Sequence, residues 1–246
     1  MKLSLPIKLG IFVVLLFAAV ITTCLLWTPV KILWFGSKLK SDKPAERVAG
    51  VNGFLALGEP GEKELLKHLP GGEPALGYMK ECWHDVSVDT YKSDNINPLY
   101  WAVLNGWTGV TGFLIDKGLD VNVIDNIRSH DYDGDGFSPL HLAAVYDRID
   151  TAELLILRGA ELNLRDAKGR TPLLVALWQN HGSFAKLLVG KGADVNAEDN
   201  NDFTPLYHAL FHDNMEIAKI LVAKGADFGE LEDRTIRIRS TRRKNR

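Results

Sequence analysis

Three aspartates near the middle of the chain have a spacing that could bind calcium. Asp131, Asp133 and Asp135 alternate in the segment Asp-Tyr-Asp-Gly-Asp-Gly, and alternating carboxylates open the calcium-binding loop of an EF-hand. Counting from Asp131, the twelfth position is Leu142 rather than the bidentate glutamate that completes such a loop. Two interpretations stay open, a long solvated loop and a partial calcium site.

Other residues that commonly do chemistry do not form a set. His208 and His212 are four residues apart, which suits metal binding on one helix face, but no third ligand is apparent. Cys82 is a single thiol without evident activation. The nucleophile-elbow, phosphate-loop and His-Glu-x-x-His motifs are absent from the sequence. We therefore expect a non-enzyme with no cofactor.

Two short motifs recur with one period in the second half of the chain. Leucine follows Pro98, Pro139, Pro172 and Pro205, which are 41, 33 and 33 residues apart, and a glycine lies 20 residues after each proline. The Asn, Ser or Thr before each proline can cap a helix that the proline begins. Apolar residues at helical spacing then predict a second helix that ends at the glycine. The unit of about 33 residues indicates a repeat protein.

With these motifs the chain resembles the ankyrin repeat family. Residues 138–144, SPLHLAA, are similar to the family's most recognisable stretch, and residues 192–197, GADVNA, to its second one. The resemblance covers residues 92–233 as four repeats. It implies an all-α solenoid of antiparallel helix pairs joined by projecting hairpin fingers.

The sequence also departs from the family pattern. The family's histidine survives as His141 alone, and its usual glycine between the helices is Asp147, Asn180 and Asp213 in three units. Asp and Asn tolerate left-handed backbone better than most residues, so we expect the turn to persist. Residues 48–91 do not keep the period and are predicted to form a cap of short helices.

The resemblance implies where a partner binds, because partners of ankyrin repeats usually contact the finger tips and the exposed end of the first helix. Large aromatics recur there at Tyr146, Trp178 and Phe211, which we place at the same repeat phase. Such residues often dominate binding. Packing between adjacent repeats is the open alternative. The predicted contact residues are Leu104, Asn105, Phe137, Tyr146, Arg170, Trp178, Gln179, Phe203, Phe211 and His212.

The formal net charge of −2 is the remainder of three unequal zones. Residues 1–47 carry a net +5, residues 48–233 a net −14, and residues 234–246 a net +7. The acidic zone predicts a partner protein with a basic surface. Nucleic acid is not expected as a partner, since its binding would require a cytoplasmic tail. The oligomeric state stays open.

Residues 9–30 contain no charged side chain, and about 20 apolar residues suffice to span a bilayer. We predict a single-pass signal-anchor in a bacterial inner membrane. Counting basic flanking residues places the C-terminal part in the cytoplasm, whereas the very short basic N-terminus is typical of an anchor that exports the rest of the chain. We take the second interpretation, with a cleaved signal peptide and a soluble periplasmic protein as the alternative.

The functional prediction is a membrane-anchored module that binds another protein, for example as an inhibitor or immunity-type protein. A calcium-responsive structural protein that uses the Asp-rich finger is the alternative. The predicted segments are a basic N-terminus (1–8), an anchor helix (9–30), a basic linker (31–47), a helical cap (48–91), four repeats (92–125, 126–165, 166–198 and 199–233) and a basic disordered tail (234–246).

Overall fold

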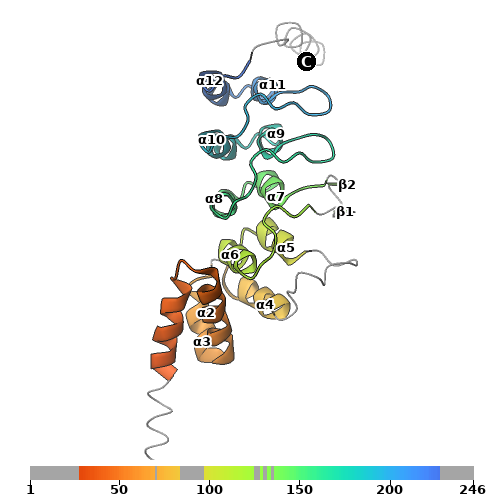
Figure 1. Cartoon of the computed structure of the whole chain (residues 1–246). Helices are drawn as coiled ribbons and strands as arrows, with labels where there is room; N and C mark the ends of the chain where they lie inside the picture. The colour runs from red at the N-terminus through yellow and green to blue at the C-terminus, as the bar shows by residue number, and fades with distance from the viewer. Residues whose placement is uncertain are drawn as a thin grey trace, which may run out of the picture. The chain divides into compact units, whose positions relative to one another are not determined.

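The computed structural model describes residues 28–69, 71–83, 97–124 and 136–227, together with the backbone of residues 128–129 and 132–133. The chain divides into two compact units, Met1–Leu76 and Gly77–Arg246 (Figure 1). Within the described part, no helix is long and apolar enough to cross a membrane. The predicted anchor at 9–30 lies outside the described residues up to residue 27, and so does the tail at 234–246.

The first unit is helical. Residues 28–39 form a helix, followed by α2 (Pro44–Ala56) and α3 (Glu59–Leu66), and α4 (Gly72–Trp83) begins in this unit. The core of the unit contains Phe54, whose ring is fully buried and lies 5.8 Å from the ring of Phe35. Glycine is required at position 53, because a Cβ there would collide with the Phe35 ring. The described helices α2, α3 and α4 cover most of residues 48–83, and residues 31–39, predicted as part of a linker, belong to the first helix.

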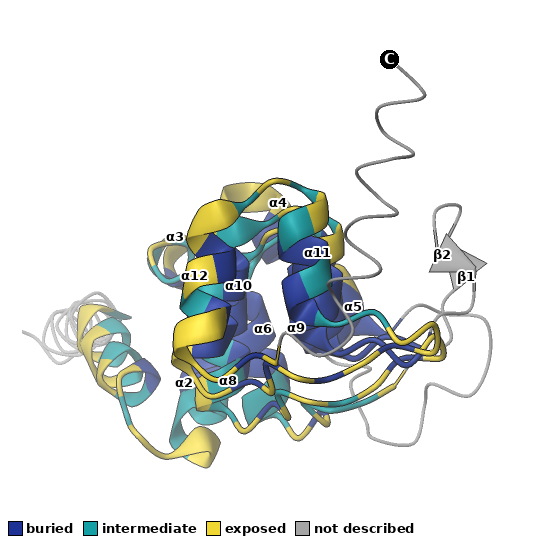
Figure 2. Ribbon diagram, turned by 90° about the horizontal axis from the view of Figure 1, so that it is seen from above, coloured by how far each residue is buried: buried dark blue, intermediate teal, exposed yellow. Residues whose placement is uncertain are grey.

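The described part of the second unit contains four helix pairs, whose first helices stack in one column and whose second helices stack in another (Figure 1). Buried residues line the faces that the two columns turn toward each other (Figure 2). This arrangement confirms the predicted solenoid of helix pairs. The pairs are α5 (Pro98–Leu104) with α6 (Thr108–Asp116), α7 (Pro139–Val145) with α8 (Ile149–Leu157), α9 (Pro172–Trp178) with α10 (Gly182–Gly190), and α11 (Pro205–Phe211) with α12 (Met215–Ala223).

Each first helix begins as its sequence predicts. The side chains of Ser138, Thr171 and Thr204 accept hydrogen bonds from the backbone N–H three residues later, and Asn97 accepts one from Leu99 at 2.9 Å. These bonds satisfy amides that a helix start would otherwise leave without an acceptor. The following proline has no N–H to satisfy and fits the first turn.

The turns between paired helices use left-handed backbone, as expected. Asp147, Asn180 and Asp213 have φ angles of 52°, 61° and 56°, and Gly106 in the first pair has 70°. The carboxylate or amide side chain at three of these turns replaces the family's glycine without loss of the fold. The same residues place a polar side chain just after the ends of α7, α9 and α11.

The asparagine of the second motif joins successive repeats, a role that the sequence did not reveal. Its side-chain oxygen accepts a hydrogen bond from a backbone N–H of the next repeat at all three junctions. The bonds run from Glu161 to Asn122 at 2.8 Å, from Asp194 to Asn163 at 2.9 Å and from Asp227 to Asn196 at 2.9 Å. The motif therefore fixes the stacking of the repeats as well as the end of a helix.

The inserted finger of the second repeat contains a short antiparallel ladder of β1 (Arg128–Ser129) and β2 (Tyr132–Asp133). The hairpin character of this finger follows the prediction. It lies on the same side as the other fingers, beyond the column of first helices (Figure 1).

Candidate functional site

Two of the predicted contact residues are prominent on the surface. Trp178 and Phe211 are 45% and 43% exposed, and each is the last residue of its first helix. Tyr146 is half-buried and follows the end of α7, so its structural equivalent in the next repeat is Gln179. The prediction that Tyr146 shares the phase of Trp178 is wrong, since that phase in the second repeat belongs to Val145, which is 5% exposed.

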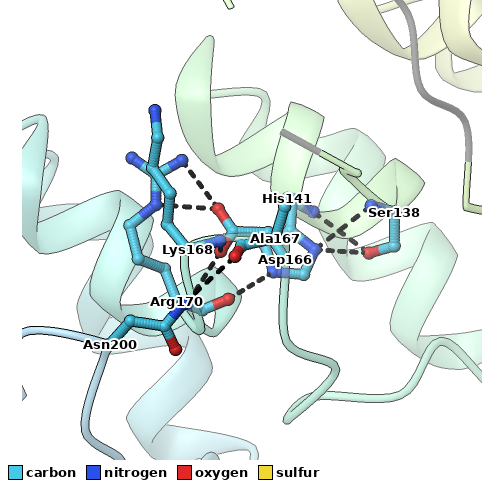
Figure 3. Close-up of polar contacts among 7 residues, drawn as sticks. All are labelled: Ser138, His141, Asp166, Ala167, Lys168, Arg170 and Asn200. Atoms are coloured by element: carbon cyan, nitrogen blue, oxygen red, sulfur yellow. Dashed lines mark hydrogen bonds and ion pairs between the residues drawn. The ribbon is translucent and has the colours of Figure 1, made fainter. Parts of the chain in front are cut away.

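Asp166 and Arg170 form a buried ion pair (Figure 3). Arg170 Nε donates to Asp166 Oδ2 at 2.7 Å, and Arg170 Nη2 lies 2.7 Å from the same oxygen. The other oxygen, Asp166 Oδ1, accepts from the backbone N–H groups of Lys168 and Arg170 at 2.9 and 2.7 Å. Both oxygens of this carboxylate are thus engaged, which is the condition under which a buried charge pair is tolerated.

The guanidinium of Arg170 also orders two aromatic rings. Its central carbon lies 5.3 Å from the ring centroid of Trp178 and 5.6 Å from that of Phe137, within the range of cation–π attraction. Arg170 and Phe137 were predicted to face a partner from the finger tips. Both are 6% exposed and are therefore not accessible to a partner here. The buried Arg170 instead lies against the indole of Trp178.

His141 links this cluster to the helix start of the preceding repeat (Figure 3). Its Nδ1 lies 2.8 Å from Ser138 Oγ and accepts from Ser138 N–H at 3.2 Å, so its Nε2 carries the proton toward Arg170 O at 2.9 Å. Burial lowers the pKa of His141. The ring is therefore a neutral connector between two repeats.

The last repeat carries a stack of aromatic rings along α11. Phe203 and Tyr207 have ring centroids 4.4 Å apart, Tyr207 and Phe211 have theirs 6.2 Å apart, and both pairs are stacked. Tyr207 was not predicted as a contact residue, although the four-residue spacing of 203, 207 and 211 could have indicated it. We call Trp178, Phe211 and His212, which lie at the ends of α9 and α11, the aromatic strip.

The two candidate metal-binding histidines have structural roles. His212 Nε2 lies 3.0 Å from Trp178 O and connects the ends of α11 and α9. His208 is 6% exposed, and burial lowers its pKa to about 4. Among the described residues no group of three His, Cys, Asp or Glu side chains could hold a metal ion.

The remaining predicted residues are less exposed or not described. Leu104, Asn105 and Gln179 are half-buried, and Asn105 Nδ2 donates to Trp101 O at 2.8 Å. Asp131 and Asp135 lie outside the described residues, and of Asp133 the structure describes the backbone pairing alone. The calcium site therefore stays a prediction. Cys82 Sγ donates to Met79 O at 3.7 Å within α4.

A comparison with known protein families identifies the family of this chain. The family model for ankyrin repeats, which describes three copies, matches residues 55–166 and again residues 153–231. The chain belongs to the ankyrin repeat family. The match begins 37 residues before the predicted start of the repeats at residue 92, so the family likeness extends into the segment predicted as a separate cap. The family model, with its three copies, does not reproduce the predicted count of four ankyrin repeats.

Curated proteins match parts of this chain. A putative palmitoyltransferase of Danio rerio, ZDHHC13, is 32% identical over 31% of this chain and 11% of its own length. The human BCL-6 corepressor-like protein 1 is 28% identical over 58% of the chain and 8% of its own length. An ankyrin repeat-containing protein of Schizosaccharomyces pombe, P1E11.10, is 34% identical over 30% and 32%. The chain thus spans a third or less of the length of each of these relatives.

Proposed function

We propose that this ankyrin chain binds another protein through its aromatic strip. The observation that carries the proposal is the exposure of Trp178 and Phe211 at equivalent helix ends, 45% and 43%. Large aromatics half-exposed on adjacent repeats form an apolar surface that water solvates poorly, and such surfaces mark binding sites.

The strip is also pre-ordered, which favours binding. Arg170 lies against the Trp178 ring, and His212 bonds to the Trp178 carbonyl. A side chain that is already held in one orientation loses less conformational entropy when a partner covers it. Exposed Asp147 and Asp213 lie in the turns beside the helix ends, so a partner with basic groups around an apolar centre fits this surface.

Partner recovery tests the binding proposal. The full chain would be cross-linked and purified from its native membranes as wild type, as Trp178→Ala, and as Leu157→Ala, a control at a 78% exposed apolar residue of α8. We expect one stoichiometric partner, retained by Leu157→Ala and bound about 30-fold more weakly by Trp178→Ala, the scale of a binding hot spot. Equal recovery by both variants would contradict the proposal.

We further propose that residues 9–30 anchor the protein in a bacterial inner membrane, with the ankyrin region on the exported side. The support is the length of the uncharged stretch and the short basic segment before it. A reporter that is active outside the cytoplasm, fused after Asp233, should be active. Activity of a cytoplasmic reporter alone would reverse the orientation.

An anchored binder of this kind could act as an inhibitor or immunity-type protein that covers the active site of an enzyme. The anchor would raise the local concentration of the module near membrane or periplasmic partners. Identification of the cross-linked partner as an enzyme whose activity falls on binding would support this narrower role, and a partner without activity would oppose it.

A further inference from the structure

The last helix pair presents apolar side chains at positions that are buried in the pair before it. We call Phe203, Tyr207, Leu210 and Val222 the end face. Val222 is 37% exposed, and the other three are half-buried. The equivalent residues one repeat earlier are buried, with exposures of 6% for Arg170, 0% for Leu174, 2% for Leu177 and 3% for Val189.

The difference arises because α11 and α12 pack on α9 and α10, whereas no described helix pair follows α12 (Figure 1). A terminal repeat of a solenoid normally has a polar outer face. Here the outer face keeps the apolar pattern of an interior repeat. It therefore favours a covering element over direct contact with water.

The sequence does not favour a further ankyrin repeat, in this chain or in another, as the element that covers the end face. At the three junctions between repeats, the asparagines bond to the backbone of the following repeat. At the corresponding place in the last repeat the residue is Gly229, which has no side chain to make that bond. The end face thus lacks the polar bridge that holds a following repeat in register.

Head-to-tail stacking of two copies is also disfavoured, because the other end of the stack is occupied. Within the second unit, Tyr78 of α4 donates to Pro98 O at 3.2 Å, and its ring lies 5.5 Å from that of Trp107. Lys117 Nζ lies 4.3 Å from the Trp83 ring centroid. An end face of a second copy would have to displace these contacts.

We propose that the chain's own residues 228–246 cover the end face. This segment begins directly after Asp227, the last described residue, and its 19 residues can extend about 60 Å. A nine-residue helix such as α12 is about 13 Å long, so the segment is long enough to cross the end face. The segment also supplies four apolar side chains, matched in number to the end face: Phe228, Leu231, Ile236 and Ile238.

Charge favours the same occupant. Residues 234–246 contain seven Lys or Arg and no acidic residue. Asp202 in the finger before α11 and Asp213 in the turn after it are polar groups at opposite ends of the helix that forms the centre of the end face. Residues 228–233 add three acidic residues, so the whole segment has a net charge of +4, opposite in sign to these two carboxylates.

Hydrogen exchange on the full chain in detergent tests the proposal. The variant Leu231→Ser/Ile236→Ser/Ile238→Ser removes apolar side chains of the segment, and Ser240→Ala/Thr241→Ala/Asn245→Ala is the matched control. We expect amides of α11 and α12 to exchange about tenfold faster in the first variant and unchanged in the control. Unchanged exchange in both variants would overturn the proposal.

A substitution on the end face separates direct contact from an indirect effect. Val222→Ser should speed exchange by a similar factor and should abolish most of the further effect of the segment variant, because contacting residues are not additive. Leu157→Ser, exposed elsewhere, should leave the segment effect intact. Fully additive effects would overturn direct contact. The proposal would also be overturned if light scattering found that the chain is a dimer and that dissociation of this dimer accounts for the faster exchange.

Discussion

The fingers that lead into α9 and α11 share a backbone design, and the contrast between them lies in the side chain four residues after a shared aspartate. In each finger an aspartate, Asp166 or Asp199, accepts from the backbone N–H groups two and four residues later. The fourth residue is Arg170 in one finger and Phe203 in the other. Arg170 is buried in an ion pair and holds Trp178, whereas Phe203 stacks on Tyr207 and stays half-exposed.

The comparison shows how one position decides between internal structure and surface. The interior finger uses a charged residue because the ion pair and two rings surround it completely. No described repeat follows the last finger to enclose a charge, and the aromatic at this position is part of the apolar end face instead. The same backbone therefore supports a buried ion pair in one repeat and an apolar end face in the next.

Removal of the aspartate carboxylate should produce the largest difference in stability between the two fingers. Asp166→Ala leaves the Arg170 charge buried without its partner and should lower the free energy of unfolding by about 3–5 kcal/mol. Asp199→Ala leaves two backbone N–H groups near exposed Asn201 without their acceptor, and water can replace it there. This variant should therefore lower the free energy of unfolding by about 1 kcal/mol. Urea unfolding of both variants measures the difference. Equal losses would show that the Arg170 pair contributes no special stability.

Acidification should destabilise the helix pair that follows the last finger. The pKa of His208 is lowered to about 4 from 6.5 by burial, so below pH 6.5 the unfolded chain binds a proton that the folded chain rejects until about pH 4. Stability attributable to His208 should fall by about 2 kcal/mol from pH 7 to pH 5. His208→Gln should lose that part of the pH dependence in urea titrations.

His141 provides an internal contrast for the pH experiment, because burial lowers its pKa as well. A residual loss of stability on acidification should therefore persist in His208→Gln. A His208→Gln protein whose stability still falls as steeply as that of the wild type would contradict the role assigned to His208.

Removal of the indole should have a smaller effect on stability than on binding. Trp178→Ala deletes a half-exposed ring and its contact with Arg170, at a cost of about 1 kcal/mol. For a chain of this size the melting temperature should fall by about 2–4 °C. A fall of 10 °C or more would show that the indole is mainly a structural element rather than a binding surface.

The smallest expected effect concerns the ring stack of the last finger. Phe203→Leu keeps an apolar side chain but removes the stacking on Tyr207, which should cost about 0.5 kcal/mol. Calorimetry should detect a shift near 1 °C or no shift. A loss as large as that of Asp166→Ala would mean that both fingers rely equally on this position.

The sequence was sufficient for the repeat, because helix caps, prolines and glycines are local signals. Ser138, Thr171 and Thr204 cap their helices as predicted, and Asp147, Asn180 and Asp213 adopt left-handed backbone. These features depend on the residues immediately beside them. A one-dimensional pattern is therefore enough to predict them.

The candidate site was predicted less well, because exposure depends on the neighbouring repeats. Phe137 and Arg170 occupy finger positions that resemble the position of Phe203, yet both are buried, Arg170 in its ion pair with Asp166 and Phe137 beside Arg170 and His141. Tyr146 was placed one position out of phase. The exposure of Val222 arises from the end of the stack, which no local motif records.

The asparagine bridges also explain where the chain can change length. The bond from Glu161 to Asn122 spans 39 residues, whereas those at the other two junctions span 31. The eight additional residues are those of the inserted finger, and the stacking bond forms across them at 2.8 Å all the same. This finger is therefore a natural grafting site, where a foreign loop can be inserted at the small entropic penalty of a longer closed segment and the register of the repeats is retained.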